Sequence, residues 1–464
     1  MKNIGAAILS LVVLSIIIYG FANFNSNSAE KNYQQYCAVC HGKNLEGGLG
    51  NNLVDGEWKL GDTDKDIIEH IEVGIKESGM PGFKDILSKE EILDLVNFIR
   101  DKESNFVDPN YRVEDVVETF DYGVNVELVT DDVDEPWGIA FISSSTILVT
   151  EQPGGLRMIE NGKLFPEPVS GTPEVRYSGQ GGMLDVAVDP EYDKNGWVYL
   201  AFSDDIDGSG MTKLVRGRIN NNKWVDEEVI FEASDEYYVD SGRHYGCRIV
   251  FDDQGHLFFS IGDLGVREQA QDISRPNGKV HRIYKDGSIP DDNPFVNDDD
   301  AFKTIFSYGN RNAQGLSIHP ETGELWESEH GQKGGDEINI IRSGNNYGWD
   351  KITYGRNYNG SVSSKYVKLP GMEVPVLFWR PSIAVCGIDF YNGDMFKKWR
   401  NHLIVGALKY EEVRLLDIED DRVIHQEIIL KDSGRVRDVS VSPDGSIYVA
   451  LNGPDKIVRL TLKK

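Results

Sequence analysis

Apolar and polar positions alternate through residues 116–464, and the alternating pattern recurs six times. Each copy has an apolar strand pattern, a turn and a second apolar strand pattern. The copies begin at Gly138, Leu184, Arg248, Gly315, Gly387 and Asp438. Period-two alternation predicts strands, and a repeat of about 50 residues is typical of propeller blades. We therefore expect an all-β six-bladed β-propeller, closed by a strand at 124–129 that completes the last blade. A β-sandwich is the alternative, but it does not require the repetition.

Residues 31–103 show helical spacing instead. Apolar residues recur on one face of 66–75, and again after an N-cap signal at Ser88. This pattern predicts a small all-α domain. Residues 104–115 are polar with one proline, which is typical of a linker.

The first 30 residues contain an apolar segment at 4–22, with a single Lys2 ahead of it. Its length lies between that of a signal peptide and that of a membrane-spanning helix. We favour an uncleaved membrane anchor over a cleaved signal. Either one predicts an exported protein, in the periplasm or on the outer face of the cytoplasmic membrane.

The formal net charge is −28, and the chain has four cysteines. Such an acidic chain excludes nucleic acid as a partner, because phosphate binding needs a cationic surface. Four cysteines are too few for a disulfide framework in a chain of this length. Cys37 and Cys40 belong to one motif. Cys247 and Cys386 either stay as small buried thiols or pair as a disulfide in an exported protein.

The motif Cys37-Ala-Val-Cys40-His41 has the spacing for covalent haem attachment. Two thiols a helical turn apart bond the haem vinyl groups, and the adjacent His41 binds iron. A thioredoxin-like motif would sit near a βαβ pattern, and none is present here. Met80, in a turn held by glycine and proline, is the candidate second iron ligand. The order of haem motif, middle helix, methionine turn and terminal helix resembles a class I cytochrome c.

Polar residues flank the strand patterns at equivalent positions of the copies. Because a hairpin reverses direction, residues before its first strand and after its second strand lie at the same rim of the central channel. Four of these residues are cations: Arg311, Lys409, Arg435 and Arg437. A solvated basic rim would explain any one of them, but four in so acidic a chain predict an anion site. His244 and Asp263 flank the same blade, and a histidine oriented by a carboxylate is the geometry of a general base.

Residues 309–337 bring two kinds of ligand group to this rim. A predicted hairpin places Arg311, Asn312 and Gln314 beside a glycine-rich loop at 329–337. The carbonyl groups of such a loop suit a hard cation. An ordinary hairpin with a polar loop is the simpler alternative.

Five motifs resemble those of the soluble pyrroloquinoline quinone (PQQ)-dependent glucose dehydrogenase family, closer to its aldose sugar dehydrogenase branch. They are SGQGGMLD at 178–185, RNAQG at 311–315, SEHGQ with GDE at 328–337, NNYGW at 345–349 and GRVRD at 434–438. The resemblance covers roughly residues 124–460. It implies oxidation of a sugar or related alcohol with PQQ and calcium.

The resemblance also implies roles for individual residues. His244 would accept the proton of the sugar hydroxyl, and Asp263 would orient His244. Arg311 and Asn312 would contact the quinone oxygens. The other implied cofactor-binding residues are Gln180, Gln314, Trp379, Lys409, Arg435 and Arg437. The backbone carbonyls of Gly331 and Gln332 would hold calcium.

Some positions depart from the family pattern. Ala313 and Gln332 stand where the family usually has proline. The substrate-binding glutamine expected after Asp263 stays open among Glu268, Gln269 and Gln271.

The two parts together predict a dehydrogenase that carries its own electron outlet. Reduced PQQ holds two electrons, whereas haem c accepts one at a time and passes it to an external acceptor. Two alternatives remain: a metal-dependent hydrolase of the lactonase type, or a glycan- or protein-binding propeller beside a separate electron carrier.

Overall fold

A computed structural model of the chain describes residues 28–104 and 116–463, apart from residues 44, 46, 52, 55–57, 59, 62 and 77. The chain divides into two compact units, Met1–Asn110 and Tyr111–Lys464. The apolar segment at 4–22 and residues 105–115 of the predicted linker lie outside the described residues. Within the described residues, no helix has the length and apolar character needed to cross a membrane.

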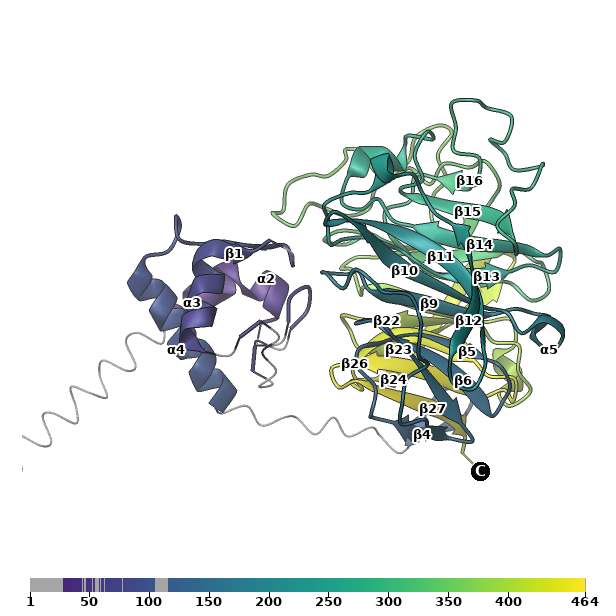
Figure 1. The fold of residues 1–464 in the computed structure, drawn as a ribbon, viewed down its shortest axis with the longest axis horizontal. Helices are drawn as coiled ribbons and strands as arrows, with labels where there is room; N and C mark the ends of the chain where they lie inside the picture. Colours follow the sequence, from purple (N-terminus) through teal and green to yellow (C-terminus); the bar gives the residue numbers. More distant parts are fainter. Residues whose placement is uncertain are drawn as a thin grey trace, which may run out of the picture. The chain divides into compact units, whose positions relative to one another are not determined.

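The first unit is built from helices (Figure 1). Residues 28–36 are helical. Then follow α2 (Ala38–His41), α3 (Asp64–Val73), β1 (Gly74–Ile75), β2 (Met80–Pro81) and α4 (Lys89–Ser104). The helices predicted at 66–75 and after Ser88 are therefore confirmed.

Both longer helices begin with the caps that their sequences provide. The Thr63 side chain accepts the backbone N–H of Asp66, and the Asp66 carboxylate accepts the N–H of Thr63. Ser88 and Glu91 make the same reciprocal pair at α4, at 3.3 and 2.8 Å. Each cap satisfies backbone donors that have no partner inside the helix. The buried faces of α3 and α4 meet in one apolar cluster with Tyr33.

The second unit contains six antiparallel sheets. Blade one is β5 (Pro136–Phe141), β6 (Thr146–Glu151), β7 (Gly155–Glu160) and β8 (Lys163–Leu164). Blade two is β9 (Met183–Val188), β10 (Val198–Ile206), β11 (Ser209–Ile219) and β12 (Trp224–Phe231). Blade three is β13 (Ile249–Phe251), β14 (His256–Ile261), β15 (Lys279–Tyr284) and β16 (Ile305–Tyr308). Blade four is β17 (Ala313–Ile318), β18 (Leu325–Glu329), β19 (Asp336–Ile341) and β20 (Leu377–Trp379).

Blade five is β21 (Val385–Phe390), β22 (Leu403–Ala407), β23 (Glu412–Glu419) and β24 (Arg422–Lys431). Blade six is β25 (Arg435–Val441), β26 (Ile447–Asn452), β27 (Lys456–Leu462), β4 (Gly123–Thr130) and β3 (Val116–Glu118). The short helices between strands are α5 (Tyr192–Asn195), η1 (Asp235–Tyr237), η2 (Arg267–Ala270) and η3 (Lys397–Trp399).

The ring closes as the sequence predicts. β4, from the start of the unit, pairs with β27 from its end, with Val126 opposite Leu460. In Figure 1 the dark blue β4 accordingly lies beside the yellow β27. The innermost strands contact one another in ring order, from β5 through β9, β13, β17, β21 and β25 back to β5. The six-bladed propeller is confirmed, and the β-sandwich alternative is wrong.

Apolar side chains fill the space between neighbouring blades. Leu184 of β9, for example, shares a buried cluster with Leu257 and Phe259 of β14. This arrangement follows from the alternation, since one face of each strand must find an apolar neighbour. The ends of the innermost strands then present polar residues at the rim of the channel.

Candidate active site

His244 and Asp263 form a close pair at the rim of blade three. The Nδ1 atom of His244 lies 2.6 Å from an Asp263 carboxylate oxygen. Asp263 is almost fully buried, whereas 13% of the His244 side chain remains exposed. With Nδ1 bonded to the carboxylate, the other ring nitrogen, Nε2, is left as the proton acceptor.

Asp263 is itself held by two further donors. The Trp349 indole N–H donates to its second oxygen at 2.8 Å, and the Gly265 N–H donates to its first at 2.7 Å. Burial acts to raise the pKa of Asp263, but the His244 ring, through its charge when protonated and its hydrogen bond, and the charge of Arg311 outweigh burial and lower that pKa. Asp263 is therefore an anion that accepts three N–H groups.

The backbone of His244 is fixed from two sides. Its N–H donates to the Gln180 side-chain oxygen at 2.8 Å, so Gln180 lies beside the base as predicted for a pocket residue. His244 has φ of 57°, in the left-handed region. A Cβ at Gly262 would lie 2.0 Å from the His244 carbonyl oxygen, so this close approach requires glycine.

Burial and the charge of Arg311 lower the pKa of His244, while Asp263 acts in the opposite direction. The imidazole is consequently neutral near pH 7 and able to take a proton.

Arg311 and Asn312 approach the base from blade four. The Arg311 guanidinium donates to the His330 carbonyl at 2.9 Å and lies 5.4 Å from the centre of the Trp349 ring. Its backbone N–H donates to the Glu329 carboxylate. The Asn312 side-chain oxygen accepts the N–H of Gly246 at 3.2 Å, two residues after the base.

The four predicted rim cations have no carboxylate partner within ion-pair distance among the described residues. Arg311 and Arg437 bond neutral groups instead, and Lys409 is exposed. Burial, with the charge of Arg437, lowers the pKa of Arg435 to about 10. Cations that form no ion pair, in an acidic protein, favour an anionic ligand.

The side-chain amide of Gln314 bonds other protein groups at both ends. Its side-chain N–H₂ donates to the Gly246 carbonyl at 2.6 Å, and its oxygen accepts from Arg437 at 3.3 Å. Both ends of this amide are therefore engaged by the protein. Gln271 is engaged similarly, by the Asn346 side chain and the Trp349 carbonyl.

The glycine-rich loop after β18 is tightly folded. The Gly331 N–H donates to Asp336 at 2.9 Å, and a Cβ at Gly331 would lie 2.2 Å from Gly335. The Gln332 carbonyl already accepts the Ser382 hydroxyl at 3.2 Å, whereas no described group donates to the Gly331 carbonyl. A carbonyl accepts more than one partner, so both oxygens fit the predicted calcium.

Trp379, a predicted cofactor residue, lies between two blades and beside the glycine-rich loop. It ends β20, the outermost strand of blade four, and its ring packs with Ile383 and Val385 between blades four and five. Its indole N–H donates to Gln426 at 3.3 Å. Its carbonyl accepts the Gly335 N–H of the glycine-rich loop at 2.8 Å.

Cys247 and Cys386 are buried free thiols, so a disulfide between them is absent from the structure. The Cys386 sulfur lies 3.8 Å from both the Gln314 oxygen and the Arg437 guanidinium. This thiol is therefore part of the wall beneath the rim cations.

The haem motif of the first unit has a suitable local geometry. Cys37 and Cys40 are half-buried and form no disulfide, and the His41 ring donates from Nδ1 to the Asn51 carbonyl at 2.8 Å. That bond leaves Nε2 directed elsewhere, as an iron ligand requires. Burial lowers the pKa of His41, which keeps the ring neutral. Met80 packs, partly buried, against the same apolar cluster as Cys37.

Buried polar atoms without partners support a bound group at the rim. Among the described residues these include Arg311 Nε, His330 Nε2 and the Gln332 side-chain oxygen. A buried polar group left unpaired costs free energy, so such atoms are expected to have a partner in the working protein. Donors such as Arg311 Nε fit a ligand rich in carboxylate and carbonyl oxygens, as PQQ is.

A protein-family model, described as glucose/sorbosone dehydrogenase, matches residues 133–459 of the chain. The chain belongs to this family. A second model, described as cytochrome c oxidase, cbb3-type, subunit III, matches residues 25–99, which confirms the N-terminal cytochrome c domain.

Individual relatives agree with this assignment. The chain is 40% identical to aldose sugar dehydrogenase YliI of Escherichia coli over 333 residues, which cover 70% of this chain and 89% of that protein. It is 24% identical to quinoprotein glucose dehydrogenase B of Acinetobacter calcoaceticus, over 70% of this chain and 84% of that protein. The crystal structure of the E. coli soluble aldose sugar dehydrogenase in its apo-form superposes with a TM-score of 0.69 at 37% identity, covering 73% of this chain and 100% of that one.

Three residues around the site were missed at the sequence level. Trp349 lies in the NNYGW motif, His330 beside the calcium-loop glycine, and Asp336 at the start of β19. Burial, with the charges of Arg311 and Arg437, lowers the pKa of His330 to about 3, so that ring is neutral. Each of the three residues contacts the site from a loop or a strand end, and the alternation of apolar and polar residues along the strands cannot predict such contacts.

Proposed function

We propose that the propeller is a quinoprotein that oxidises an aldose or a related alcohol with PQQ and calcium, and that the electrons pass to the c-type haem of the same chain. The observation that carries the proposal is the His244–Asp263 pair beside four cations that form no ion pair with any described carboxylate. The family supports it, as does the quinoprotein named among the relatives.

His244 has the central role in the proposed chemistry. Its Nε2 atom accepts the proton of the substrate hydroxyl, and the Asp263 anion stabilises the imidazolium that forms. When bound, PQQ with its calcium supplies the hydride acceptor. The fixed backbone of His244 keeps Nε2 at one place during this transfer, so the base stays oriented toward the substrate hydroxyl.

The surrounding residues hold the cofactor in this proposal. Arg435 and Arg437, with the exposed Lys409, suit its carboxylates, because guanidinium groups bind carboxylates in forked geometry. Arg311 and Asn312 suit the quinone oxygens. Gln314 supports Arg437 from below the site.

The haem domain would supply the electron outlet. Cys37 and Cys40 would attach the haem, and His41 with Met80 would bind its iron. An external acceptor then reoxidises the haem. We also propose an exported protein, in the periplasm or on the outer face of the cytoplasmic membrane, because of the apolar segment at 4–22; recovery of the full-length chain in the cytoplasmic fraction would contradict this.

Calorimetric titration with PQQ in the presence of calcium tests the proposal. We expect saturable binding with one PQQ per chain, and weaker binding when Arg437 is replaced by methionine. A propeller that acts as a hydrolase or only binds glycans would show no PQQ binding, and that result would refute the quinoprotein assignment.

Calcium affinity is expected to depend on Asp336 far more than on the Gln332 side chain. If backbone carbonyls hold the ion, Gln332→Ala should change calcium affinity by less than about threefold, whereas Asp336→Asn should weaken it about 10- to 100-fold, as for other groups that orient metal ligands. Asp336 accepts the N–H groups of Gly331 and Ala384, so its charge fixes the loop. Calcium titration of the melting temperature measures both. Equal losses in the two variants would identify the Gln332 side chain as a ligand instead.

A further inference from the structure

We propose that Arg248 is a positioning residue. By bonding the backbone carbonyls of Gln314 and Arg437, it holds in place the end of the channel at which PQQ would bind. The inference rests on the proposed function, since it assigns Arg248 to the PQQ site. Arg248 itself lies one layer below the rim, and its hydrogen bonds and ion pairs within the described residues go to neither His244 nor the predicted calcium loop.

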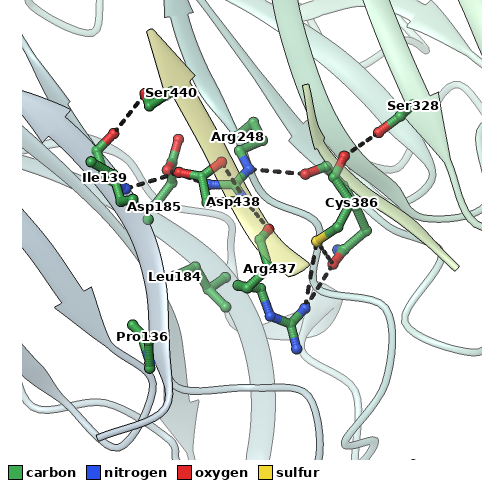
Figure 2. A network of polar contacts seen from close by, with 12 residues as sticks. Pro136, Ile139, Leu184, Asp185, Arg248, Ser328, Cys386, Arg437, Asp438 and Ser440 are labelled. Carbon is green, nitrogen blue, oxygen red and sulfur yellow. Dashed lines mark hydrogen bonds and ion pairs between the residues drawn. The ribbon is translucent and has the colours of Figure 1, made fainter. Parts of the chain in front are cut away.

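The Arg248 guanidinium bonds two carbonyl groups of other blades. Its Nε donates to the Gln314 carbonyl of blade four at 2.9 Å, and one terminal nitrogen donates to the Arg437 carbonyl of blade six at 2.8 Å. Figure 2 shows Arg248 from blade three reaching the strand that carries Arg437 and Asp438. Arg248 is only 5% exposed, so solvent cannot replace these bonds.

Two aspartates hold the guanidinium in place. Asp185 of blade two lies 2.9 Å from it and Asp438 of blade six 3.1 Å. Each carboxylate also accepts a backbone N–H from another blade, Asp185 from Ile249 at 2.7 Å and Asp438 from Ile139 at 2.9 Å. The network therefore joins blades one, two, three, four and six.

The channel makes room for this layer by omitting side chains. A Cβ at Gly138 would lie 2.6 Å from an Asp185 oxygen, and a Cβ at Gly387 would lie 2.2 Å from an Asp438 oxygen. These are the first residues of repeats one and five; Arg248 and Asp438 are the first residues of repeats three and six, and Asp185 is the second residue of repeat two. The charged side chains of Asp185, Arg248 and Asp438 therefore fit in this layer only because Gly138 and Gly387, which face them, have no side chain.

The layer above depends on the two carbonyls that Arg248 holds. The side chains of Arg437 and Gln314 meet at 3.3 Å, and Gln314 also donates to Gly246, two residues from the base. The Trp137 ring lies 4.2 Å from the Arg248 guanidinium and 5.8 Å from that of Arg437, so it packs against both layers. Moving Arg248 would therefore displace a predicted anion-binding cation and an amide joined to the base segment.

The test compares Arg248→Lys and Arg248→Met with a matched control, Arg157→Met. Arg157 also forms a buried ion pair, at 2.9 Å from Glu151, but within blade one. We expect all three variants to melt at lower temperature, with Arg248→Lys the least affected because it retains a charge between the aspartates. PQQ affinity, measured by calorimetry at saturating calcium, should fall about 10- to 100-fold in both Arg248 variants, because a lysine cannot reproduce the fork that binds two carbonyls. Arg157→Met should keep the wild-type affinity.

The outcomes separate this inference from the proposed function. If wild type binds PQQ and the Arg248 variants bind it within twofold of wild type, Arg248 is only structural and the inference is overturned. If wild type itself does not bind PQQ, the proposed function fails first. If Arg248→Met does not fold, Arg248→Lys and Asp438→Asn carry the same comparison. Asp438→Asn keeps the side-chain shape but replaces one carboxylate that holds the guanidinium. Unchanged PQQ affinity in both variants would also overturn the inference.

Discussion

Replacing His244 by glutamine is expected to lower turnover by about 10²- to 10⁴-fold, the usual contribution of a positioned general base. Glutamine keeps a polar side chain of similar reach, but it cannot take a proton near pH 7. The backbone contacts of residue 244 to Gln180 and around Gly262 do not involve the ring, so they persist in the variant. PQQ affinity should therefore stay near that of wild type while turnover is lost.

His256 supplies a matched control for this substitution. It too bonds an aspartate through Nδ1, at 2.7 Å from Asp252, but it is the first residue of β14, directly after the turn from β13. His256→Gln should leave turnover within about twofold of wild type, as for a substitution away from the reacting groups. A steady-state rate for His244→Gln equal to that of His256→Gln would remove His244 from the mechanism.

Asp263→Asn is expected to cause the second largest loss, about 10²- to 10³-fold in turnover, because an oriented and charge-stabilised base contributes much of general-base catalysis. The aspartate accepts three N–H groups, from His244, Trp349 and Gly265. An asparagine has one acceptor oxygen and must turn its N–H₂ toward at least one of these donors. The His244 ring is then held in a wrong orientation or loses its partner.

The pH profile distinguishes this effect from simple loss of structure. Burial and Arg311 lower the pKa of His244, and Asp263 opposes them. In wild type we expect the acid limb of kcat/KM below pH 6.5, the ordinary histidine value. Removing the Asp263 charge should move the limb to still lower pH. An unmoved or alkaline-shifted limb in Asp263→Asn would contradict the electrostatic role of Asp263.

Asp263 also contributes stability with a defined sign. Its pKa is lowered in the folded protein, so the contribution is present above pH 3.8 and lost as pH falls through the folded value. Asp263→Asn should accordingly melt below wild type at pH 7, and the difference should shrink in acid.

The sequence predicted the elements whose signals are local or periodic. The six blades followed from a pattern repeated along the chain, and ring closure followed from one unassigned strand at 124–129 that the structure pairs as part of β4. The pairing of His244 with Asp263 followed from hairpin geometry, which places both ends of a strand pair at one rim. The haem motif could be predicted because haem attachment requires two cysteines and a histidine close together in the sequence.

Contacts across loops and between blades could not be predicted in the same way. Trp349 reaches Asp263 from a loop 86 residues further along the chain, where no periodicity fixes its direction. Arg248 was recognised only as the start of a strand, because its partners come from three other blades. The resemblance implied that Trp379 binds the cofactor, and no pattern in the sequence showed that its ring packs between blades four and five.

Stopped-flow spectroscopy of the haem band tests the central claim most directly. The full-length chain, with haem attached and loaded with PQQ and calcium, is mixed with an excess of aldose and no external acceptor. The account predicts rapid haem reduction that requires substrate and PQQ, and that is lost in His244→Gln but retained in His256→Gln. A haem that stays oxidised while the propeller oxidises aldose with an added artificial acceptor would contradict the proposal that both cofactors work in series.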